Sequence, residues 1–277
     1  MKKVIKILSV VLALVLIVGC FAACGGDKED KNKGIKIGAQ TNTTGDIYAS
    51  GDFGKDAVTG YSNGALAVEA LKNGKVDCVI IDNEPAKAYV AANTGLKILE
   101  TEYAVEDYAI CFRKGNTELK DAVDGALKEL IADGSVKTII DKYINSDSEA
   151  KNLVGVPVEA EDTDKPNLTM ATNAEFPPYE YIDGDMYYGI DVEVAKIIAD
   201  KLGYDLVIAN VDFDSIIPGV QAGKYDMGMA GMTVTKDRLK SVDFSSSYAT
   251  GIQVVIVKED SKIQAIEDLD PYYLPKE

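Results

Sequence analysis

Apolar residues recur along the chain with two spacings, and each spacing predicts one type of element. From Asp191 to Leu202 they fall three or four residues apart, which predicts an amphipathic helix that ends at Gly203. The segment from Asn116 to Ile131 has the same spacing and predicts a second helix. Short uninterrupted apolar runs, such as Cys78 to Ile81, predict buried strands. The alternation of these helices and strands predicts an α/β fold.

The same pattern occurs in two halves of the chain. In each half a short helix ends in a Gly-Lys turn, and an aspartate, Asp77 or Asp226, then leads into a buried strand. Asp82 lies five residues after Asp77, and Gly231 lies five residues after Asp226. The ends of two strands, one in each half, therefore occupy equivalent places. Because ligands bind beyond the carboxyl ends of strands in such sheets, we expect two lobes that face each other across a cleft.

Polar groups follow these predicted strands. The turn from Thr233 to Arg238 offers backbone amides and a guanidinium, a combination that binds a carboxylate. A second threonine-rich turn, from Gln40 to Asp46, follows the predicted strand from Ile35 to Ala39. Asp82 stands at the end of an apolar strand, where it suits an ammonium group. Each feature also has a purely structural interpretation as a helix cap or a solvated charge, but together they match a zwitterion.

Composition narrows the function classes. The chain has 277 residues, 47% of them apolar and 27% charged, which is typical of a globular protein large enough for two lobes. Its net charge of -16 disfavours nucleic acid and anionic lipid as partners, although acidity also serves solubility. It has no histidine, the usual general base and zinc ligand. Cys78 and Cys111 stand singly in apolar runs, so we expect small buried residues, no metal site and no cofactor.

The N-terminus has the pattern of an export signal. Three lysines precede an apolar run from Ile7 to Gly19, which is too short to cross a bilayer comfortably. Because the run ends in a sequence that resembles a bacterial lipobox, residues 1–19 are predicted to be a lipoprotein signal peptide, with Cys20 as the lipid attachment site and Cys24 as the alternative. Residues 20–33 then form a polar linker. An uncleaved anchor helix is the other interpretation, and both place the remainder outside the cytoplasm.

Several motifs resemble those of bacterial solute-binding proteins of family 3, the polar amino acid receptors of ABC importers. They stand at the spacing of that family and together cover nearly everything after residue 33. The motifs are Thr172–Tyr181, Gly189–Ala195, Asp212–Pro218, Gly231–Arg238 and Val242–Ser245. The resemblance implies a two-lobed, periplasmic-binding-protein-like fold of type II, with two crossover strands that form a hinge.

The resemblance also assigns the groups that would bind the carboxylate of an amino acid. Arg238 would pair with the α-carboxylate, helped by the backbone amides of Thr233 and of Thr43 or Thr44. The family usually has glycine where Asn42 stands, so the conformation of that turn is an open question.

The remaining contacts concern the ammonium group and the side chain of the ligand. Asp82 would take the α-ammonium, beside the carbonyl of Gly231 and the hydroxyl of Thr233. Phe176 and Phe213 would enclose the ligand side chain, although core packing is an equal interpretation for Phe213. Two polar residues would lie near the end of that side chain and influence specificity: Asn173 and Glu175.

The motifs stand in an unusual order. In the family the segment that resembles Thr172–Tyr181 comes first, and the one that resembles Gln40–Asp46 follows the strand from Ile252 to Lys258. Here the second part precedes the first, so we expect a circular permutation in which residues 145–167 link the usual C- and N-termini. A truncated tandem or an incorrectly assembled gene is the rival interpretation.

The permuted order predicts the composition of the lobes. Strands from Glu106 to Phe112 and from Gly251 to Val257 would cross between them. Residues 34–107 with 255–277 would form the lobe that carries Asp82, and residues 108–254 would form the lobe that carries Arg238.

Together these features predict an extracytoplasmic, lipid-anchored binding protein rather than an enzyme. It would capture a free polar or cationic amino acid in the cleft as a monomer and deliver it to an ABC transporter permease, touching the bacterial cell membrane only through its anchor. One alternative is an exported dehydratase of the prephenate or arogenate type, which shares the fold, with Glu175 or Asp82 as an acid. Another is a ligand-sensing subunit of a signalling receptor. The sequence does not identify the amino acid.

Overall fold

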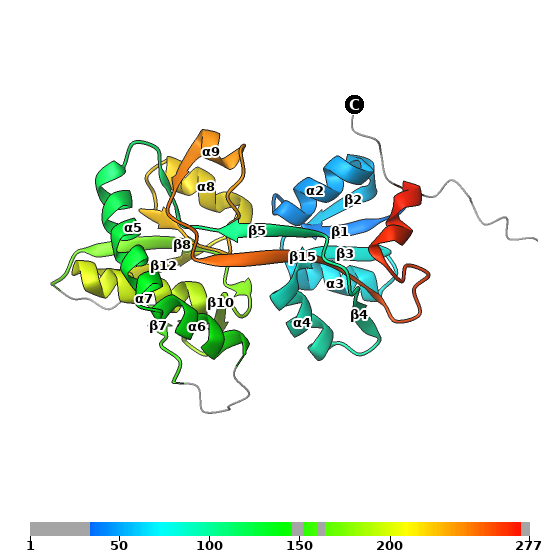
Figure 1. Ribbon diagram of the computed structural model, residues 1–277, viewed down its shortest axis with the longest axis horizontal. Helices are drawn as coiled ribbons and strands as arrows, with labels where there is room; N and C mark the ends of the chain where they lie inside the picture. Colours follow the sequence, from blue (N-terminus) through cyan, green and yellow to red (C-terminus); the bar gives the residue numbers. More distant parts are fainter. Residues whose placement is uncertain (1–33, 146–151, 160–163, 273–277) are drawn as a thin grey trace, which may run out of the picture. The chain divides into compact units, whose positions relative to one another are not determined.

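Two groups of apolar runs become the central strands of two separate sheets. The computed structural model describes residues 34–145, 152–159 and 164–272, and the described residues from Ile35 onward belong to one compact unit. The predicted signal peptide, Cys20, Cys24 and the linker 20–33 lie outside the described residues. Both sheets carry helices (Figure 1), so the α/β class predicted from the sequence is confirmed.

The first sheet has the strand order β2-β1-β3-β15-β4. The strands in this order are β1 (Ile37–Gln40), β2 (Val58–Tyr61), β3 (Cys78–Asp82), β4 (Leu96–Ile98) and β15 (Ala249–Lys258). A sixth strand of the sheet, β5 (Ala104–Tyr108), pairs with β15 outside this order. Its helices are α2 (Thr44–Phe53), α3 (Gly64–Lys72) and α4 (Asn83–Ala92), with the short 3-10 helices η1 (Lys55–Ala57) and η2 (Ile266–Tyr272). We call these elements the first lobe.

The second sheet has the strand order β12-β8-β13-β6-β14. Its strands are β6 (Cys111–Arg113), β8 (Asn167–Thr172), β12 (Asp205–Asn210), β13 (Met227–Gly228) and β14 (Val242–Phe244). Its helices are α5 (Thr117–Ala132), α6 (Ser135–Ile144), α7 (Ile190–Leu202), α8 (Phe213–Gln221) and α9 (Arg238–Ser241). A small sheet adjoins it, made of β7 (Val156–Pro157), β9 (Glu175–Phe176), β10 (Glu180–Asp183) and β11 (Met186–Tyr188). We call these elements the second lobe.

The two large sheets have the same pairing pattern. In the first, β1 pairs in parallel with β2 and β3, and β15 is antiparallel to β3 and β4. In the second, β8 pairs in parallel with β12 and β13, and β6 is antiparallel to β13 and β14. The repeat that the sequence shows in its two halves is therefore a repeat of topology, and each sheet is completed by an antiparallel strand from a distant part of the chain.

Burial on both faces explains the uninterrupted apolar runs. All five residues of β3 are buried, and alternate residues point to opposite faces of the sheet. Val79 and Ile81 pack with residues of α3, such as Leu71, while Cys78 and Ile80 pack with Phe53 of α2. Helices therefore cover both faces of the first sheet.

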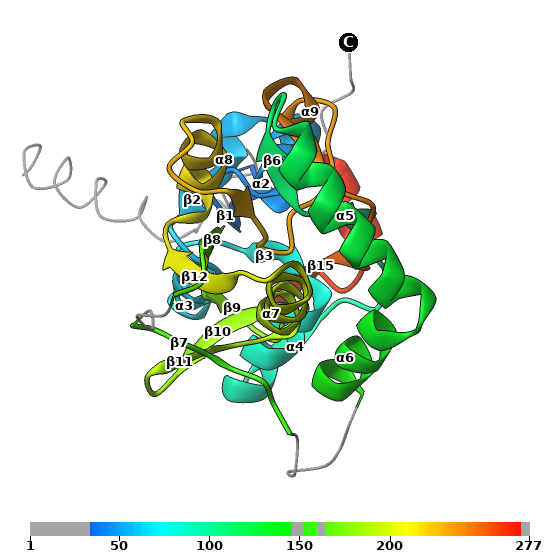
Figure 2. The same cartoon turned by 90° about the vertical axis from the view of Figure 1, so that its left-hand side faces the viewer.

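The second lobe buries its core around α7. This helix contacts α5 and α6 as well as strands of the small sheet, and in Figure 2 it lies between the small sheet and α6. The predicted helix over Asp191–Leu202 is confirmed within one residue, and Gly203 ends it in the left-handed conformation. The predicted linker 145–167 is not wholly irregular, because Val156 and Pro157 form β7 and pair with β11.

Two strands pass between the lobes side by side. β5 (Ala104–Tyr108) pairs antiparallel with the beginning of β15, and Figure 1 shows the two running together from one lobe to the other. The sequence predicted one continuous strand from Glu106 to Phe112, which is wrong: β5 ends at Tyr108 and β6 begins at Cys111. Between them the backbone changes partners, since the amide of Ala109 donates to the carbonyl of Met232. The predicted lobe boundaries themselves stay predictions.

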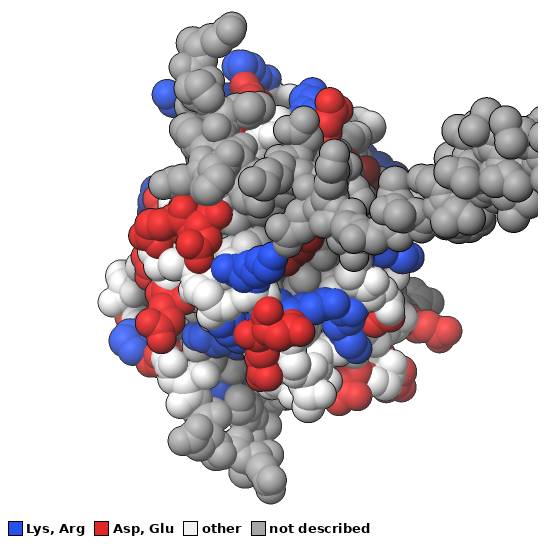
Figure 3. All heavy atoms as spheres, turned by 90° about the vertical axis from the view of Figure 1, so that its right-hand side faces the viewer, with Lys and Arg blue, Asp and Glu red and all other residues white. Residues whose placement is uncertain are grey.

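Basic and acidic side chains lie interspersed on the face of the molecule that Figure 3 shows. Elsewhere among the described residues, some charged side chains form ion pairs within one helix, such as Lys72 with Glu69 and Lys87 with Glu84. Such exposed pairs contribute little to stability. Across the described ranges, no helix combines the length and the apolar character needed to cross a membrane.

Candidate functional site

The turn between β1 and α2 forms one wall of the site. The hydroxyl of Thr43 donates to the carbonyl of Gln40 (2.7 Å), which holds the turn tightly against the strand end. Asn42 has a φ of 61°, a left-handed conformation that asparagine tolerates better than most residues and that glycine also adopts readily. The backbone amide of Asn42 donates a hydrogen bond to the side chain of Asp46 (2.9 Å). The amides at the start of α2, including that of Thr44, have no acceptor within the helix.

Arg238 lies beside this turn although it belongs to the other lobe. Its guanidinium donates to the carbonyl of Thr233 (2.8 Å) and to the carbonyl of Asn42 (3.0 Å), and it stacks 5.3 Å from the ring centre of Phe213. Only 8% of the residue is exposed. Burial lowers the pKa of Arg238 and Glu106 opposes that shift, but an arginine stays protonated in any case. A buried cation therefore stands next to the free amides of α2.

Asp82 supplies a buried carboxylate at the end of β3. Burial is the main reason that its pKa is raised to about 8, and the negative charge of Glu106 adds to the shift. The hydroxyl of Tyr108 donates a hydrogen bond to the Asp82 carboxylate. The Tyr108 ring lies directly over Gly251, where an added Cβ would come within 2.2 Å of it. A glycine is therefore needed beside Tyr108 to let its hydroxyl reach Asp82.

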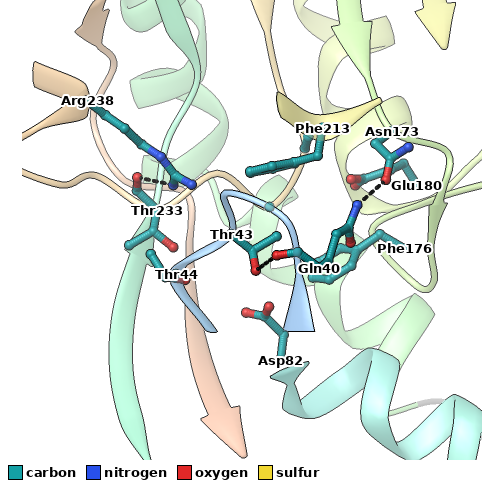
Figure 4. A pocket seen from close by; sticks show the side chains of 12 residues that line it. Gln40, Thr43, Thr44, Asp82, Asn173, Phe176, Glu180, Phe213, Thr233 and Arg238 are labelled. Carbon is teal, nitrogen blue, oxygen red and sulfur yellow. Dashed lines mark hydrogen bonds between the residues drawn. The ribbon is translucent and has the colours of Figure 1, made fainter. Parts of the chain in front are cut away.

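These groups converge on one pocket, where about 310 Å³ of space, open solvent included, is free of protein atoms. Its lining comes from both lobes (Figure 4) and comprises Gln40, Thr43, Thr44, Asp82, Asn173, Phe176, Glu180, Phe213, Ala230, Gly231, Thr233 and Arg238. Nine of the ten residues predicted as ligand contacts are among them. Their roles toward a ligand stay predictions, but the structure brings them together.

Glu175 is the predicted residue that does not line this pocket. It is exposed and lines a neighbouring, more open pocket, which shares Asn173 with the first. The reason is the alternation of side chains along β9: Phe176 faces the first pocket, so the preceding residue points elsewhere.

Three lining residues were not predicted from the sequence. Gln40 donates from its side-chain amide to Asn173 Oδ1 (2.8 Å), which joins the two lobes across the pocket (Figure 4). Ala230 lies directly before Gly231 in the loop that follows β13. Gln40 directly precedes the threonine-rich turn, so its position at a strand end was the available indication.

Glu180, the third of them, is fully buried. Burial and the neighbouring Asp191 raise the pKa of Glu180 well above its ordinary value. The pKa of Asp191 is itself raised to about 6, mainly by burial, although the Gly231 amide (2.8 Å) and the Tyr248 hydroxyl (2.9 Å) both donate to it. Burial and the acidic neighbour therefore favour the protonated form of Glu180 beside the pocket. Glu180 is the first residue of β10, and its place in the motif Thr172–Tyr181 was the available indication in the sequence.

Comparisons with known proteins agree with this geometry. The model of bacterial extracellular solute-binding proteins, family 3, matches residues 61–146 and 168–276. The arginine-binding extracellular protein ArtP of Bacillus subtilis (strain 168) is 42% identical over 105 residues, which are 38% of this chain and 41% of ArtP. A probable histidine-binding protein of Neisseria gonorrhoeae is 35% identical over 101 residues, 36% of this chain and 38% of that protein.

A solved structure of an ancestral arginine-binding protein bound to arginine is 44% identical and covers 28% of this chain and 35% of its own, with a TM-score of 0.28. The chain spans about two fifths of the length of the first curated relatives that it matches. With the family match, the predicted two-lobed fold of periplasmic-binding-protein type II is confirmed. The permuted order of its halves stays a prediction.

Proposed function

Because the chain belongs to the bacterial extracellular solute-binding proteins of family 3, we propose that it binds a free amino acid in the pocket between its lobes and delivers it to an ABC importer. The observation that carries the proposal is the presence of a buried guanidinium and a buried carboxyl group at one pocket. Arg238 comes from the second lobe and Asp82 from the first. A zwitterion offers a carboxylate to Arg238 and an ammonium that favours the ionised form of Asp82, whereas a simple anion or cation would satisfy one of the two.

Each end of the zwitterion has partners of the right kind. The α-carboxylate would meet the guanidinium of Arg238 and the amides at the start of α2, a combination that suits an anion. The α-ammonium would meet the carboxylate of Asp82 and the hydroxyl oxygen of Thr233. That hydroxyl already donates to Glu106 (3.1 Å), so its lone pairs remain free to accept from an ammonium.

The side chain of the ligand is proposed to be cationic. Glu180 also lines the pocket, and its carboxyl group, which its surroundings favour in the protonated form, could accept a hydrogen bond from a polar or cationic side chain. Phe176 and Phe213 offer ring faces that attract a cation. The names of the relatives, an arginine-binding protein and a probable histidine-binding protein, support the same class of ligand.

We do not propose that the protein catalyses a reaction. The family consists of solute-binding proteins. Glu175, one of the two candidate acids of the dehydratase alternative, lies outside the pocket. The other, Asp82, is bonded to Tyr108 at the strand end.

We further propose the circular permutation and the lipid anchor. Leu269 of η2 packs in the same hydrophobic cluster as Ile35 and Ile37, and in the family order these segments follow one another. The two separate stretches of the family match also flank the proposed linker. A chain with residues 167–272 placed before residues 34–145 should fold and bind the same ligand; failure to fold would count against the permutation. Loss of lipid labelling in C20S but not in C24S would place the anchor.

The test of binding is a thermal melt of residues 34–277 with each common amino acid. A ligand at a thousand times its dissociation constant adds about 4 kcal/mol to stability, a clear shift. We expect arginine, lysine or histidine to raise the melting temperature and to be recovered unchanged. The proposal would be contradicted if the protein melts cooperatively and no amino acid changes its melting temperature. Consumption of prephenate or arogenate by the protein would also contradict it.

A further inference from the structure

Glu106 is a buried carboxylate on the strand that crosses between the lobes. It lies in the middle of β5 and is 5% exposed. The next residue, Asp107, is exposed on the opposite side of the same strand. Glu106 is not part of the pocket lining, and no role has so far been given to it beyond its effect on neighbouring pKa values.

One oxygen of Glu106 accepts hydrogen bonds from three different places. Its Oε2 accepts from the hydroxyl of Thr44 (2.9 Å), the hydroxyl of Thr233 (3.1 Å) and the side-chain amide of Gln253 (2.9 Å). Thr44 begins α2 in the first lobe, Thr233 belongs to the second lobe, and Gln253 lies on β15. A single atom on the crossing strand β5 is thus bonded to both lobes and to the other crossing strand, β15.

These bonds fix the direction of two hydroxyl groups that line the pocket. A hydroxyl has one hydrogen to donate, and in Thr44 and Thr233 that hydrogen points to Glu106. Neither hydroxyl can then donate to a ligand carboxylate, which is left to Arg238 and the backbone amides. Both can accept from a ligand ammonium. Glu106 therefore makes the pocket end next to it an acceptor of hydrogen bonds.

Other hydrogen bonds also join the lobes, but they have neutral partners or a backbone carbonyl as acceptor. Gln40 bonds to Asn173, Tyr89 donates to the carbonyl of Glu175, and Arg238 donates to the carbonyl of Asn42. At Glu106, by contrast, three hydrogen bonds meet on one side-chain oxygen, and this residue stands on the strand that crosses between the lobes.

We propose that Glu106 is a positioning residue that couples the two lobes: it holds Thr44 and Thr233 at the spacing of the closed pocket and orients their hydroxyls as acceptors. The coupling of the lobes stands by itself, whereas the orientation of the hydroxyls toward a ligand rests on the proposed function. Removing the carboxylate should then favour an arrangement with the lobes apart, as in hinge motions of two-lobed proteins.

The test compares E106Q with D107N. Both exchange one carboxylate for an amide on adjacent residues of β5, and only the first faces the two threonines. We expect E106Q to melt cooperatively, at a temperature equal to or above that of the wild type. We expect the affinity of E106Q to fall at least about tenfold for every amino acid that the wild type binds, which corresponds to about 1.4 kcal/mol of binding free energy. The ranking of the amino acids by affinity should stay the same. D107N should match the wild type.

The position of the lobes is measured without ligand by small-angle X-ray scattering. The unliganded E106Q should have a larger radius of gyration than both D107N and the wild type. Affinity within twofold of the wild type together with an unchanged radius would overturn the proposal. Should E106Q not fold, Q253M removes one of the three donors and should shift both quantities in the same direction; wild-type values would again overturn it. If the wild type binds no amino acid, the proposed function fails, but the scattering comparison still decides the role of Glu106.

Discussion

The hydroxyl of Tyr108 donates a hydrogen bond to the carboxylate of Asp82, which links the crossing strand β5 to the end of β3. This contact fixes the direction of a carboxylate that burial keeps away from water, and it does so from the strand about which the lobes would move. The group that is proposed to bind the ammonium is therefore oriented by the hinge itself.

The first prediction concerns stability and pH. The pKa of Asp82 is about 8 in the folded protein against an ordinary 3.8, so between these values the folded state binds more protons than the unfolded state. The free energy of unfolding of the unliganded protein should therefore fall as the pH rises from about 4 to about 8, because Asp82 ionises less readily in the folded state than in the unfolded state. In D82N that decline should be smaller, and the variant should exceed the wild type at pH 8 by about 1–3 kcal/mol in urea unfolding. Equal pH dependence in both proteins, with D107N as control, would contradict the assignment.

The second prediction concerns affinity and pH. A ligand ammonium needs Asp82 ionised, so below the pKa of about 8 each binding event must release a proton. Affinity should increase with pH between 6 and 8, by at most about tenfold per unit, because one unit of pKa corresponds to 1.36 kcal/mol. Calorimetry in two buffers of different ionisation enthalpy measures the released proton directly. D82N should bind at least about a hundredfold more weakly and release none, since an unpaired buried charge costs about 2–5 kcal/mol.

The third prediction concerns the carboxylate partner. R238A should weaken binding of every amino acid by about 2–5 kcal/mol, because the ligand carboxylate would be left without its buried counter-charge. R238K keeps the charge but loses the planar fork, so it should recover only part of the affinity. Titration calorimetry measures both. K240A, an exposed lysine two residues away, is the control, and near-normal affinity in R238A would remove the carboxylate assignment.

The fourth prediction concerns the space next to Phe176. Gly231 has a φ of 50°, and an added Cβ would come within 2.8 Å of the Phe176 ring. G231A should displace that ring and abolish measurable binding. Gly95, with a φ of 82° and no atom within 4 Å of an added Cβ, is the matched control. G95A should lose about 1–3 kcal/mol of stability through backbone strain alone and keep its ligand. Equal affinity in the two variants would show that the ring does not form the pocket wall.

Much of the secondary structure follows from the sequence because its periodicity is local. The apolar spacing of residues 191–202 predicts α7, and the fully apolar run from Cys78 predicts β3, since a helix or a doubly covered strand needs those patterns wherever it lies. The misplacement of Glu175 was avoidable on the same grounds. Adjacent residues of a strand point to opposite sides, so Phe176 and Glu175 do not enter the same pocket.

By itself the sequence determined many of the elements, the repeat of two lobes and nine residues that line one pocket. It did so because strand ends and helix starts are local features, and these features supply the binding groups. Only the tertiary structure decided how the lobes meet. Gln40 bonds to Asn173 across 133 positions, and Glu106 gathers Thr44 and Thr233 from both lobes. No local pattern encodes these bonds, because each depends on how two separately folded sheets are brought together by the strands that cross between them.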